Sequence, residues 1–494
     1  MLLCLTITRS TRKGSPVRSN PDALASRLYD LAMQAGAVPF RDPAGRLYVS
    51  FAVQGHHEHH PIHSQALRSW LQQLGHASTG RLPGREALAQ AIERLEAEAL
   101  FNGRECQTFV RIADHEGGIY LDLGDPDWRA ICVTPYGWGV VTTPPVKFRR
   151  PRGLRPLPIP IPGGCVEELR PFLNLPDADA FRLVTHWLVG ALRGRGPYVI
   201  LGLYGQQGST KSTTARVLRR LVDPNTAELR SEPHEVRDLM VGANNAHVLA
   251  FDNVSTIRPW LSDAICRLAT GGGFATRELY SDDQETLIDA QRPVIINSIV
   301  DVFTRPDLLD RAIIIRLDDL PDTKRRAESD YWAAFVSAQG RILGALLDSV
   351  VVALRDEPTI HLAALPRMAD FAKWSVASAG ALPWGPDTFL QAYEANRAQA
   401  TVALLETDPV ALAIQRMLAV WSHGYWEGTA TDLLPQLQNR GEAISRFETD
   451  PRKATAALRR LAPALRAVGI YITTAEKHGG RRIYQLMDIR QGQP

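Results

Sequence analysis

The spacing of apolar residues divides the chain into a mixed N-terminal part, a central part with buried strands and a helical remainder. Over residues 1–143, helical periods alternate with short apolar runs, which is typical of a small α+β domain. Helical periods fall at 21–35, 64–74 and 85–100, and strand-like runs at 47–53, 108–112, 118–123, 130–134 and 138–142. Residues 9–20 are polar and basic, so we expect a loose arm there.

The central and C-terminal parts have different patterns. Apolar runs at 198–204, 246–251, 293–296 and 312–315 are separated by helical patterns, as expected for an α/β fold with a parallel sheet. Helical periods then fall at 323–354, 364–378 and 387–406. After residue 407 the expected order is helices at 408–421, 430–438 and 451–468, then strands at 470–474 and 482–486. Three helices followed by a hairpin predict a winged-helix-like domain.

Residues 144–164 read as a linker between the first two parts. The segment holds seven prolines, a density that favours an extended conformation. It also carries a basic cluster made of Lys147, Arg149, Arg150, Arg152 and Arg155. These cations would either contact nucleic acid or belong to a solvated tether, and the sequence leaves both interpretations open.

The stretch after the first central strand carries the most specific chemistry. A glycine-bearing turn leads to Lys211 and Ser212, and a helical pattern follows at 213–221. Strand, glycine-rich loop, Lys-Ser and helix form the P-loop arrangement, whose backbone N–H groups and helix N-terminus surround a phosphate. The expected nucleotide-binding residues are Gly205, Gln206, Gln207, Gly208, Ser209, Thr210, Lys211, Ser212 and Thr213.

Within this loop, we expect Lys211 to contact the β- and γ-phosphates of ATP and Ser212 to ligate Mg²⁺. The usual pattern has glycine directly before the lysine, but Thr210 stands here. Because a Cβ atom restricts φ, Thr210 is expected to narrow or strain the loop. The alternative is an ordinary strand–turn–helix with a chance lysine.

Polar residues also end the following strands. Asp252 follows the run 246–251, where an acid can hold Mg²⁺ through water, the Walker B role. The alternative for Asp252 is a capping or surface acid. Asn253 comes next, at a place where many ATPases have a glutamate that activates water, so the catalytic base is uncertain from sequence. Asn297 follows the run 293–296 and is expected to orient water against the γ-phosphate.

An arginine-bearing segment, RPDLLDR at 305–311, precedes the fourth central strand. An arginine at the position of Arg311 commonly reaches the nucleotide of a neighbouring subunit as an arginine finger. A solvated or salt-bridged arginine is nearly as good an interpretation of Arg311 alone.

The order and compactness of the motifs between Gly205 and Asn297 resemble the helicase core of superfamily 3, a branch of the AAA+ ATPases of viruses, phages and plasmids. The segment also resembles ATPases of bacterial mobile elements related to poxvirus- and phage-type primase-helicases. Residues 270–286 are similar to the family's β-hairpin, which carries a basic residue into a central pore. The resemblance covers roughly residues 165–375. It implies Arg277 as the pore residue, a turn near 281–283, and a ring of subunits, most often a hexamer.

The third helix expected in the C-terminal part is basic. Arg459 and Arg460 lie on it, and Arg481 lies in the hairpin that follows. Residues of this kind supply phosphate contacts, which dominate non-specific affinity for DNA. The alternative is an amphipathic helix with a solvated basic face.

Composition restricts the class of protein. A chain of 494 residues with 45% apolar and 22% charged residues is typical of a globular protein with several domains. The net charge of +3 means that any nucleic-acid surface must be local. Five scattered cysteines without a CxxC pair argue against disulfides or a zinc finger and favour the cytoplasm. No run approaches the ~18 apolar residues of a membrane span, so no membrane contact is expected.

Two other clusters favour structural interpretations. Residues 55–63 contain five histidines and Glu58, and we expect a solvated loop there rather than a zinc site. Asp122, Asp125 and Asp127 could suggest a polymerase-type metal site, but the Gly-Asp-Pro turn explains the later acids.

The sequence therefore predicts an α/β P-loop AAA+ core with a small N-terminal α+β domain and a C-terminal winged-helix-like domain. The expected division is an α+β domain at 1–143, a basic linker at 144–164, the ATPase core at 165–320, a helical lid at 321–406 and the winged-helix-like domain at 407–494. The expected function is an ATP- and Mg²⁺-dependent helicase on single-stranded or forked DNA in a phage or mobile-element replication system, with a possible primase or other replication partner. A loader or remodelling ATPase that does not unwind, and a DNA-binding protein with a vestigial ATPase, remain alternatives.

Overall fold

The computed structural model describes residues 21–272, 274–277, 285–288, 290–438, 450–477 and 481–491. Their contacts divide the chain into two compact units. The first unit ends at Thr108 and also includes Lys147–Arg149. The second unit consists of residues 109–146 and 150–494.

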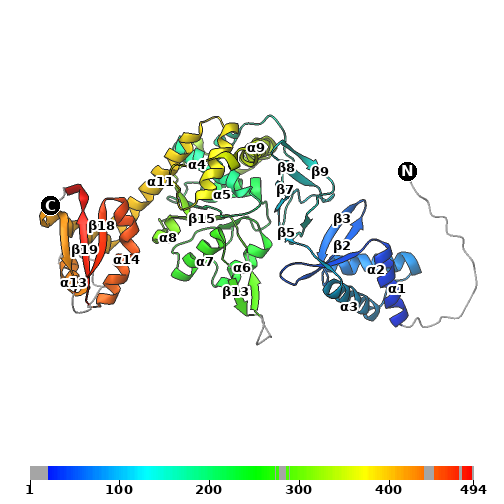
Figure 1. The fold of residues 1–494 in the computed structure, drawn as a ribbon. Coiled ribbons are helices and arrows are strands. Elements are labelled where there is room, and N and C mark those ends of the chain that lie inside the picture. The colour runs from blue at the N-terminus through cyan, green and yellow to red at the C-terminus, as the bar shows by residue number, and fades with distance from the viewer. Residues whose placement is uncertain are drawn as a thin grey trace, which may run out of the picture. The chain divides into compact units, whose positions relative to one another are not determined.

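The first unit packs three helices against a four-stranded sheet (Figure 1). The helices are α1 (Pro21–Gln34), α2 (Gln65–Thr79) and α3 (Arg85–Phe101). The strands, in their order across the sheet, are β3 (His56–Pro61), β2 (Leu47–Val53), β1 (Val38–Arg41) and β4 (Arg104–Glu105). The core forms where apolar residues of the helices meet Val49 and Phe51 of β2. The unit is thus of the α+β type expected from the sequence.

The histidine-rich segment forms strand β3 instead of the expected solvated loop. It pairs antiparallel with β2, from Tyr48↔Pro61 to Val53↔His56. The Glu58 carboxylate lies 3.2 Å from His56 Nε2 and 2.6 Å from His60 Nε2. Backbone pairing and these side-chain contacts therefore order a segment whose polar composition suggested a loop. In the described part of the chain, no group of three or more His, Cys, Asp or Glu residues is placed to hold a metal ion.

A four-stranded antiparallel meander belongs to the second unit, although the sequence placed it in an N-terminal domain ending at residue 143. Its strands are β6 (Ile112–His115), β7 (Gly118–Asp122), β8 (Ala130–Thr134) and β9 (Gly137–Val141). The boundary differs because the apolar face of the meander packs on helix α9 (Glu328–Asp356) within one core. Trp138 Nε1 also donates a hydrogen bond to Asp348 Oδ1 on α9 at 2.8 Å.

The centre of the second unit is a parallel sheet in the order β12-β15-β11-β16. Its strands are β11 (Ile200–Tyr204), β12 (Leu249–Phe251), β15 (Val294–Ser298) and β16 (Ala312–Arg316). The helices around it are α4 (Ala178–Ala191), α5 (Lys211–Val222), α6 (Val236–Asn245), α7 (Pro259–Thr270) and α8 (Pro306–Leu309). The predicted parallel α/β arrangement is confirmed, and the predicted strands shift only at their ends.

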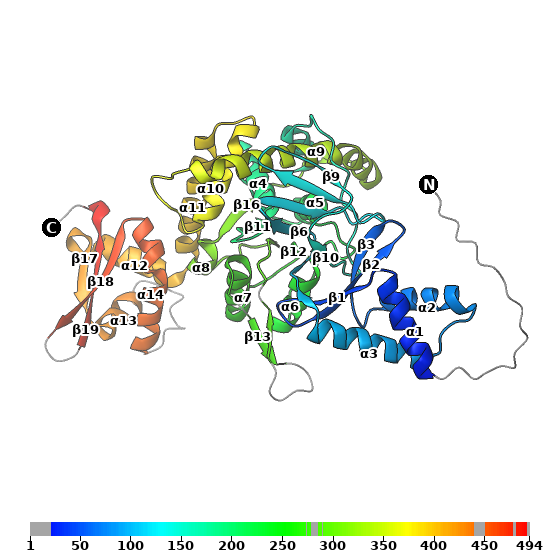
Figure 2. The same ribbon diagram turned by 45° about the vertical axis from the view of Figure 1, so that its right-hand side comes forward.

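Both faces of this sheet are buried, which explains why its strands read as continuous apolar runs. Leu201 and Leu203 of β11 share a core with α4, α5 and α9, whereas Ile200 shares a core with α6 and α7. Figures 1 and 2 show these two groups of helices on opposite sides of the sheet. Because parallel strands end at the same edge, the residues after β11, β12 and β15 come close together.

A buried ion pair ties the meander to this sheet. Arg111, next to β6, has φ +66° and its Nε lies 3.1 Å from Asp223 Oδ1, with both side chains at most 1% exposed. Asp223 directly follows α5, and its Oδ2 accepts hydrogen bonds from the backbone N–H groups of His247 and Val248 before β12. One carboxylate therefore joins three elements of the second unit.

The proline-rich segment 144–164 is packed rather than a free tether. Arg150 Nη2 lies 2.6 Å from Asp122 Oδ1, and this arginine is only 14% exposed. Leu157 is buried and its N–H bonds to Leu123 O. These contacts favour a structural role for Arg150 over a nucleic-acid contact. Arg129 lies 2.6 Å from Asp125 and 3.8 Å from Asp127 in the same region, so all three acids considered as a metal site have arginine partners.

Helices surround and follow the sheet. Besides α9, they are α10 (Ala369–Ser378) and α11 (Pro386–Thr407), with the shorter helical turns η1 (Val166–Phe172), η2 (Asp322–Lys324), η3 (Glu357–Thr359) and η4 (Ala379–Ala381).

Residues 328–359 are long and apolar enough to cross a membrane by length and composition, contrary to expectation. More than half of that apolar window, 56%, is buried inside the protein, so packing in the core explains its composition.

The described residues of the C-terminal part form three α-helices and a three-stranded antiparallel sheet in the order β17-β19-β18. Its elements are α12 (Pro409–Val420), η5 (Ser422–Gly424), β17 (Tyr425–Gly428), α13 (Ala430–Gln438), α14 (Pro451–Ala467), β18 (Ile470–Lys477), β19 (Arg481–Asp488) and η7 (Ile489–Gln491). Residues of α12 and α14 share one core cluster with Leu308 and Leu309 of α8. The remaining strands, β5 (Thr108–Phe109) and β10 (Lys147–Phe148), lie where the chain passes from one unit to the other.

Candidate nucleotide site

The loop between β11 and α5 is a tight turn, and only a small residue fits at its first position. A Cβ atom on Gly205 would lie 2.4 Å from the carbonyl oxygen of Leu317, a distance that no side chain tolerates. Gly208 has φ +91°, in the region that favours glycine. Gln206, Gln207 and Gly208 are exposed, so the outer half of the loop is open to solvent. The two glycines thus serve the turn that the sequence predicts.

Thr210 carries the strain expected from its place in the loop. Its φ and ψ are +65° and +20°, a left-handed conformation that is unusual for a β-branched residue. Such a conformation costs on the order of 1–3 kcal/mol. The Oγ1 atom of Thr210 is also buried without a hydrogen-bond partner. Thr210, in place of the usual glycine, therefore keeps the left-handed backbone of the loop, and this backbone is strained directly before Lys211.

The Lys211 side chain folds back into the loop. Its Nζ donates hydrogen bonds to Gly205 O at 2.7 Å and Gln206 O at 2.6 Å. Burial lowers the pKa of Lys211, while the charges of Asp252 and Asp319 act in the opposite direction. The ammonium group is thus held by loop carbonyls at the mouth of the turn, where an anionic ligand would compete for it.

Three predicted residues meet at the carboxyl edge of the sheet. Ser212 Oγ donates to Asp252, with distances of 2.9 and 3.1 Å to the two carboxylate oxygens. Asn297 Nδ2 donates to Asp252 Oδ1 at 3.0 Å. The cluster brings together the first turn of α5, the end of β12 and the end of β15, as the sequence predicts.

Several polar atoms at this edge are buried without partners among the described residues. They are Asn297 Oδ1, Ser298 Oγ, Thr210 Oγ1 and Thr214 Oγ1. Buried polar groups are nearly always satisfied in folded proteins, so unpaired ones call for an explanation such as a ligand, an ion or water. The hydroxyl of Ser212 and the carboxylate of Asp252 are also the hard oxygen donors that Mg²⁺ prefers. The residues present therefore fit a bound metal–phosphate group.

Asn253 occupies the place where a catalytic glutamate was considered. It is exposed and has φ +56°, a conformation that asparagine tolerates better than most residues. The next N–H, that of Val254, bonds to Asn297 O at 2.9 Å and so fixes this turn to β15. The turn thus presents an amide instead of a carboxylate.

The two arginines of the 305–311 segment are held within their own subunit. Arg311 Nη1 donates to Asp307 O at 2.6 Å, and Arg311 Nε is buried without a partner in the described part of the chain. Arg305 pairs with Asp263 at 2.8 Å and with Asp307 at 3.2 Å. Arg305 is therefore a salt-bridged residue. Arg311 has spare donors, and its role as an arginine finger stays a prediction.

The hairpin predicted to carry the pore residue is present. β13 (Phe274–Arg277) pairs antiparallel with β14 (Glu285–Ile288), in the register Arg277↔Glu285. Arg277 is the last residue of β13. The predicted turn near residues 281–283 lies outside the described residues, and so does the side chain of Arg277.

The predicted DNA contacts on α14 separate into two kinds. Arg459 is exposed. Arg460 Nη2 instead pairs with Asp408 Oδ2 at 2.6 Å, and Asp408 caps the N-terminus of α12. Arg460 is therefore part of a structural contact, which sequence spacing alone does not reveal. Arg481 begins β19, and its side chain lies outside the described residues.

Asn174 was missed by the sequence analysis. Its Nδ2 donates to Asp318 O at 2.7 Å and lies 3.4 Å from Ser209 O, so it connects the P-loop to the segment after β16. No motif precedes the P-loop closely enough to identify it, because 35 residues separate Asn174 from Ser209.

Comparison with solved structures and curated proteins gives limited similarity. Two apo structures of the NrS-1 C-terminal region are 14% and 12% identical to this chain, with TM-scores of 0.42 and 0.39. Each similarity covers 93% of this chain and 98% of the other. No curated protein matches.

Two family models match the second unit. Residues 166–399 match the actinomycete integrative conjugative element replication protein, and residues 410–493 match the C-terminal domain of the same replication protein, RepA. The expected origin in a mobile element is thereby confirmed, while the relation to superfamily 3 helicases stays a prediction. Because the two models together cover more than half of the sequence, the chain belongs to the family of replication proteins of actinomycete integrative conjugative elements.

Proposed function

We propose that this replication protein is a Mg-ATP-driven motor that unwinds DNA during replication of its mobile element. The observation that carries the proposal is the meeting of Ser212, Asp252 and Asn297 beside the P-loop lysine, with unpaired buried polar atoms around them. A bound Mg-nucleotide would give those atoms partners. The family of mobile-element replication proteins supplies the setting.

The chain's residues would act on ATP in distinct ways. Lys211 would exchange the carbonyls of Gly205 and Gln206 for the β- and γ-phosphates, and the N–H groups at the start of α5 would face the same anion. Ser212 and Asp252 would hold Mg²⁺, which neutralises charge that develops on the phosphates. Asn297 would place its free Oδ1 toward the attacking water.

Hydrolysis is proposed to need a second copy of the chain. Among the described residues, Arg311 donates one hydrogen bond, to Asp307 O, and its other donors would serve the nucleotide of a neighbouring subunit. This requires a ring, which we propose to be a hexamer of AAA+ modules resembling superfamily 3. The β13–β14 hairpin would bring Arg277 to DNA in the ring, coupling hydrolysis to movement along one strand.

The C-terminal part would load the motor on DNA. Its element order, with three helices and a three-stranded sheet, supports a winged-helix-like DNA-binding domain. The exposed Arg459 on α14 would contact phosphate. Forked or single-stranded DNA in the cytoplasm is the proposed substrate, and a primase is a possible partner.

The test compares wild type with Arg277→Ala in forked-duplex unwinding and DNA-stimulated ATP hydrolysis. The proposal expects Arg277→Ala to bind forked DNA almost normally but to lose unwinding and stimulation. Equal unwinding by the two proteins would mean that the hairpin does not act in a pore. Point substitutions are preferable to removing the chain after residue 406, because α12 and α14 share a core with α8.

A second candidate function is a loader or switch that binds ATP without unwinding DNA. Asn253 and the strained Thr210 favour it, since an amide cannot act as a general base and the loop departs from the usual glycine. DNA-stimulated hydrolysis without strand displacement would support this function. ATP binding without any hydrolysis would instead support a vestigial ATPase.

A further inference from the structure

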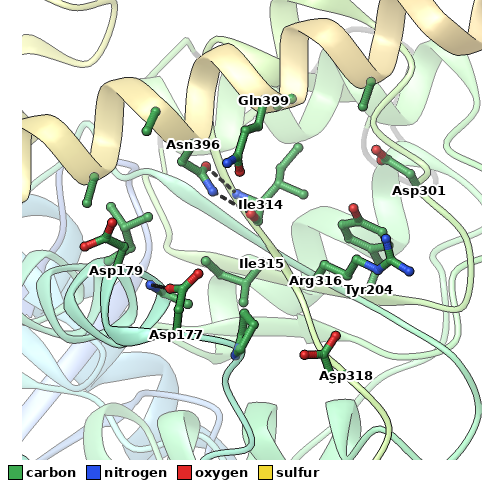
Figure 3. Close-up of a pocket in the computed structure, with 17 residues that line it drawn as sticks. Asp177, Asp179, Tyr204, Asp301, Ile314, Ile315, Arg316, Asp318, Asn396 and Gln399 are labelled. Carbon is green, nitrogen blue, oxygen red and sulfur yellow. Dashed lines mark hydrogen bonds between the residues drawn. The ribbon is translucent and has the colours of Figure 1, made fainter.

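A pocket opens between α4, β16 and α11 (Figure 3). Its volume is about 200 Å³. Leu183, Ile315, Ala392 and Ala400 contribute apolar walls, and Tyr204 contributes an aromatic ring. This space is smaller than the ~300–1,000 Å³ of a pocket for a whole drug-sized ligand, so it suits part of a larger molecule.

The pocket and the P-loop are connected by the chain itself. Tyr204 is the last residue of β11 and directly precedes Gly205. Asp318 also lines the pocket, and its backbone carbonyl accepts a hydrogen bond from Asn174 Nδ2, which lies 3.4 Å from the P-loop carbonyl oxygen of Ser209. Two residues that line the pocket are therefore joined to the P-loop, Tyr204 along the chain and Asp318 through Asn174.

The charges around the pocket decide which part of a ligand it accepts. Its lining includes four aspartates and one cation, Arg316. Asp177 is used as the N-cap of α4, and Asp301 accepts a hydrogen bond from the N–H of Phe303, but Asp318 is exposed at the rim. An acidic rim repels phosphate and suits groups that donate hydrogen bonds, such as hydroxyl and amino groups.

Helix α11 supplies an amide at the same place. Asn396 is fully engaged, because it bonds to both the N–H and the carbonyl of Ile314 on the edge strand β16. Gln399, one turn further along α11, is exposed and lines the pocket (Figure 3). An exposed amide offers both a donor and an acceptor to a ligand.

We propose that this pocket binds the nucleobase and ribose of the nucleoside triphosphate whose phosphates lie on the P-loop. This inference rests on the proposed ATP site. Tyr204 supplies an aromatic surface against the base, Gln399 contacts the base edge, and Asp318 accepts hydrogen bonds from ribose hydroxyls. The pocket thereby distinguishes a nucleotide from a bare polyphosphate.

The experiment measures binding of two probes, Mg-ATP and Mg-tripolyphosphate, to the full chain by calorimetry. Ala400→Trp fills the pocket, and Ala398→Trp adds the same side chain at an exposed position on α11 that does not line the pocket. Ala400→Trp is expected to weaken Mg-ATP binding at least about tenfold and to leave tripolyphosphate within about twofold. Ala398→Trp is expected to change neither. Gln399→Leu, at an exposed site, is expected to weaken only Mg-ATP and provides a variant that does not crowd the core.

The outcomes separate this inference from the proposed function. Unchanged Mg-ATP binding in both Ala400→Trp and Gln399→Leu would overturn the pocket assignment, and so would equal weakening of both probes. Lys211→Ala should weaken both probes. If Lys211→Ala weakens neither, the ATP site itself is wrong, whatever the pocket variants do.

Discussion

Ser212 Oγ donates a hydrogen bond to Asp252 Oδ1 over 2.9 Å, although 40 residues separate the two in the sequence. The bond joins the first turn of α5, the helix that follows β11, to the end of β12, a strand that β15 separates from β11 in the same parallel sheet. It also brings together the hydroxyl and the carboxylate that Mg²⁺ would need. The chemistry of the site thus depends on how closely these two elements are held.

Thr210→Gly is expected to stabilise the protein. Relief of the left-handed strain outweighs the extra freedom of glycine in the unfolded chain, so the free energy of unfolding should rise by about 1 kcal/mol. Thr213→Gly is the matched control, because Thr213 lies within α5, where the same change should lower stability by about 1 kcal/mol. Denaturant unfolding of both variants measures the effect. A loss of stability in Thr210→Gly would show that the threonine is not strained.

Stability should fall as the pH drops from 6.5 toward 4. Burial lowers the pKa of His247 from 6.5 to about 4, so between these values the unfolded chain binds a proton that the folded protein does not. This single group contributes a slope of at most ~1.4 kcal/mol per pH unit. His186, with a pKa lowered to about 3, adds a similar slope.

His59 also has a pKa lowered to about 3 by burial, so three histidines contribute slopes of the same sign. His247→Gln should therefore reduce their combined pH dependence by about a third. His234→Gln, at an exposed site, should leave the dependence unchanged. The measurement is the free energy of unfolding by denaturant at several pH values between 4 and 7. Identical slopes for wild type and His247→Gln would contradict the assignment of a neutral, buried His247.

Two adjacent arginines on α14 should behave differently. Arg460→Ala breaks the pair with Asp408 and is expected to lower the free energy of unfolding by up to about 1 kcal/mol. Arg459→Ala should change stability by less than about 0.5 kcal/mol but weaken forked-DNA binding and reduce its salt dependence. Fluorescence anisotropy over a range of salt concentrations, together with denaturant unfolding, separates the two effects. The reverse assignment of effects would contradict the geometry.

Arg311→Ala is expected to bind ATP and to lose hydrolysis by about 10³-fold, as for other arginine fingers. Mixing it with Asp252→Ala subunits should restore part of the turnover, because hybrid interfaces combine an intact arginine with an intact metal site. Steady-state ATPase assays of the single and mixed proteins test this. If only Arg305→Ala shows this behaviour, the finger is Arg305, and full hydrolysis by a monomer would contradict action between subunits.

The sequence predicted which candidate site residues lie together better than it predicted their surroundings. Lys211, Ser212, Asp252 and Asn297 follow strands whose apolar runs are continuous, because both faces of the sheet are buried. Strand ends of a parallel sheet meet at one edge, so local patterns were sufficient to bring these residues together. Contacts that depend on tertiary packing were not predictable in this way. Asn174 is one example, and the Arg460–Asp408 pair, with partners 52 residues apart, is another.

Domain membership was the other feature that local patterns did not determine. The strands at 112–141 were expected, but their place against α9 depends on residues more than 200 positions away, such as the partner of Trp138. The histidine-rich strand β3 is ordered by its pairing with β2, which outweighs its polar composition. In both cases the local propensity was compatible with several arrangements, and long-range packing selected one.

The most direct test of the central claim is ATP hydrolysis by the purified full chain, with and without forked DNA, compared between wild type and Lys211→Ala. We expect the wild type to hydrolyse ATP and forked DNA to stimulate this hydrolysis. We expect Lys211→Ala to lose nucleotide binding or turnover. The variant should remain folded, because the hydrogen bonds of the Lys211 side chain to other described residues all go to the loop around it. Hydrolysis and ATP affinity in Lys211→Ala equal to those of wild type would contradict the claim that this loop is the nucleotide site.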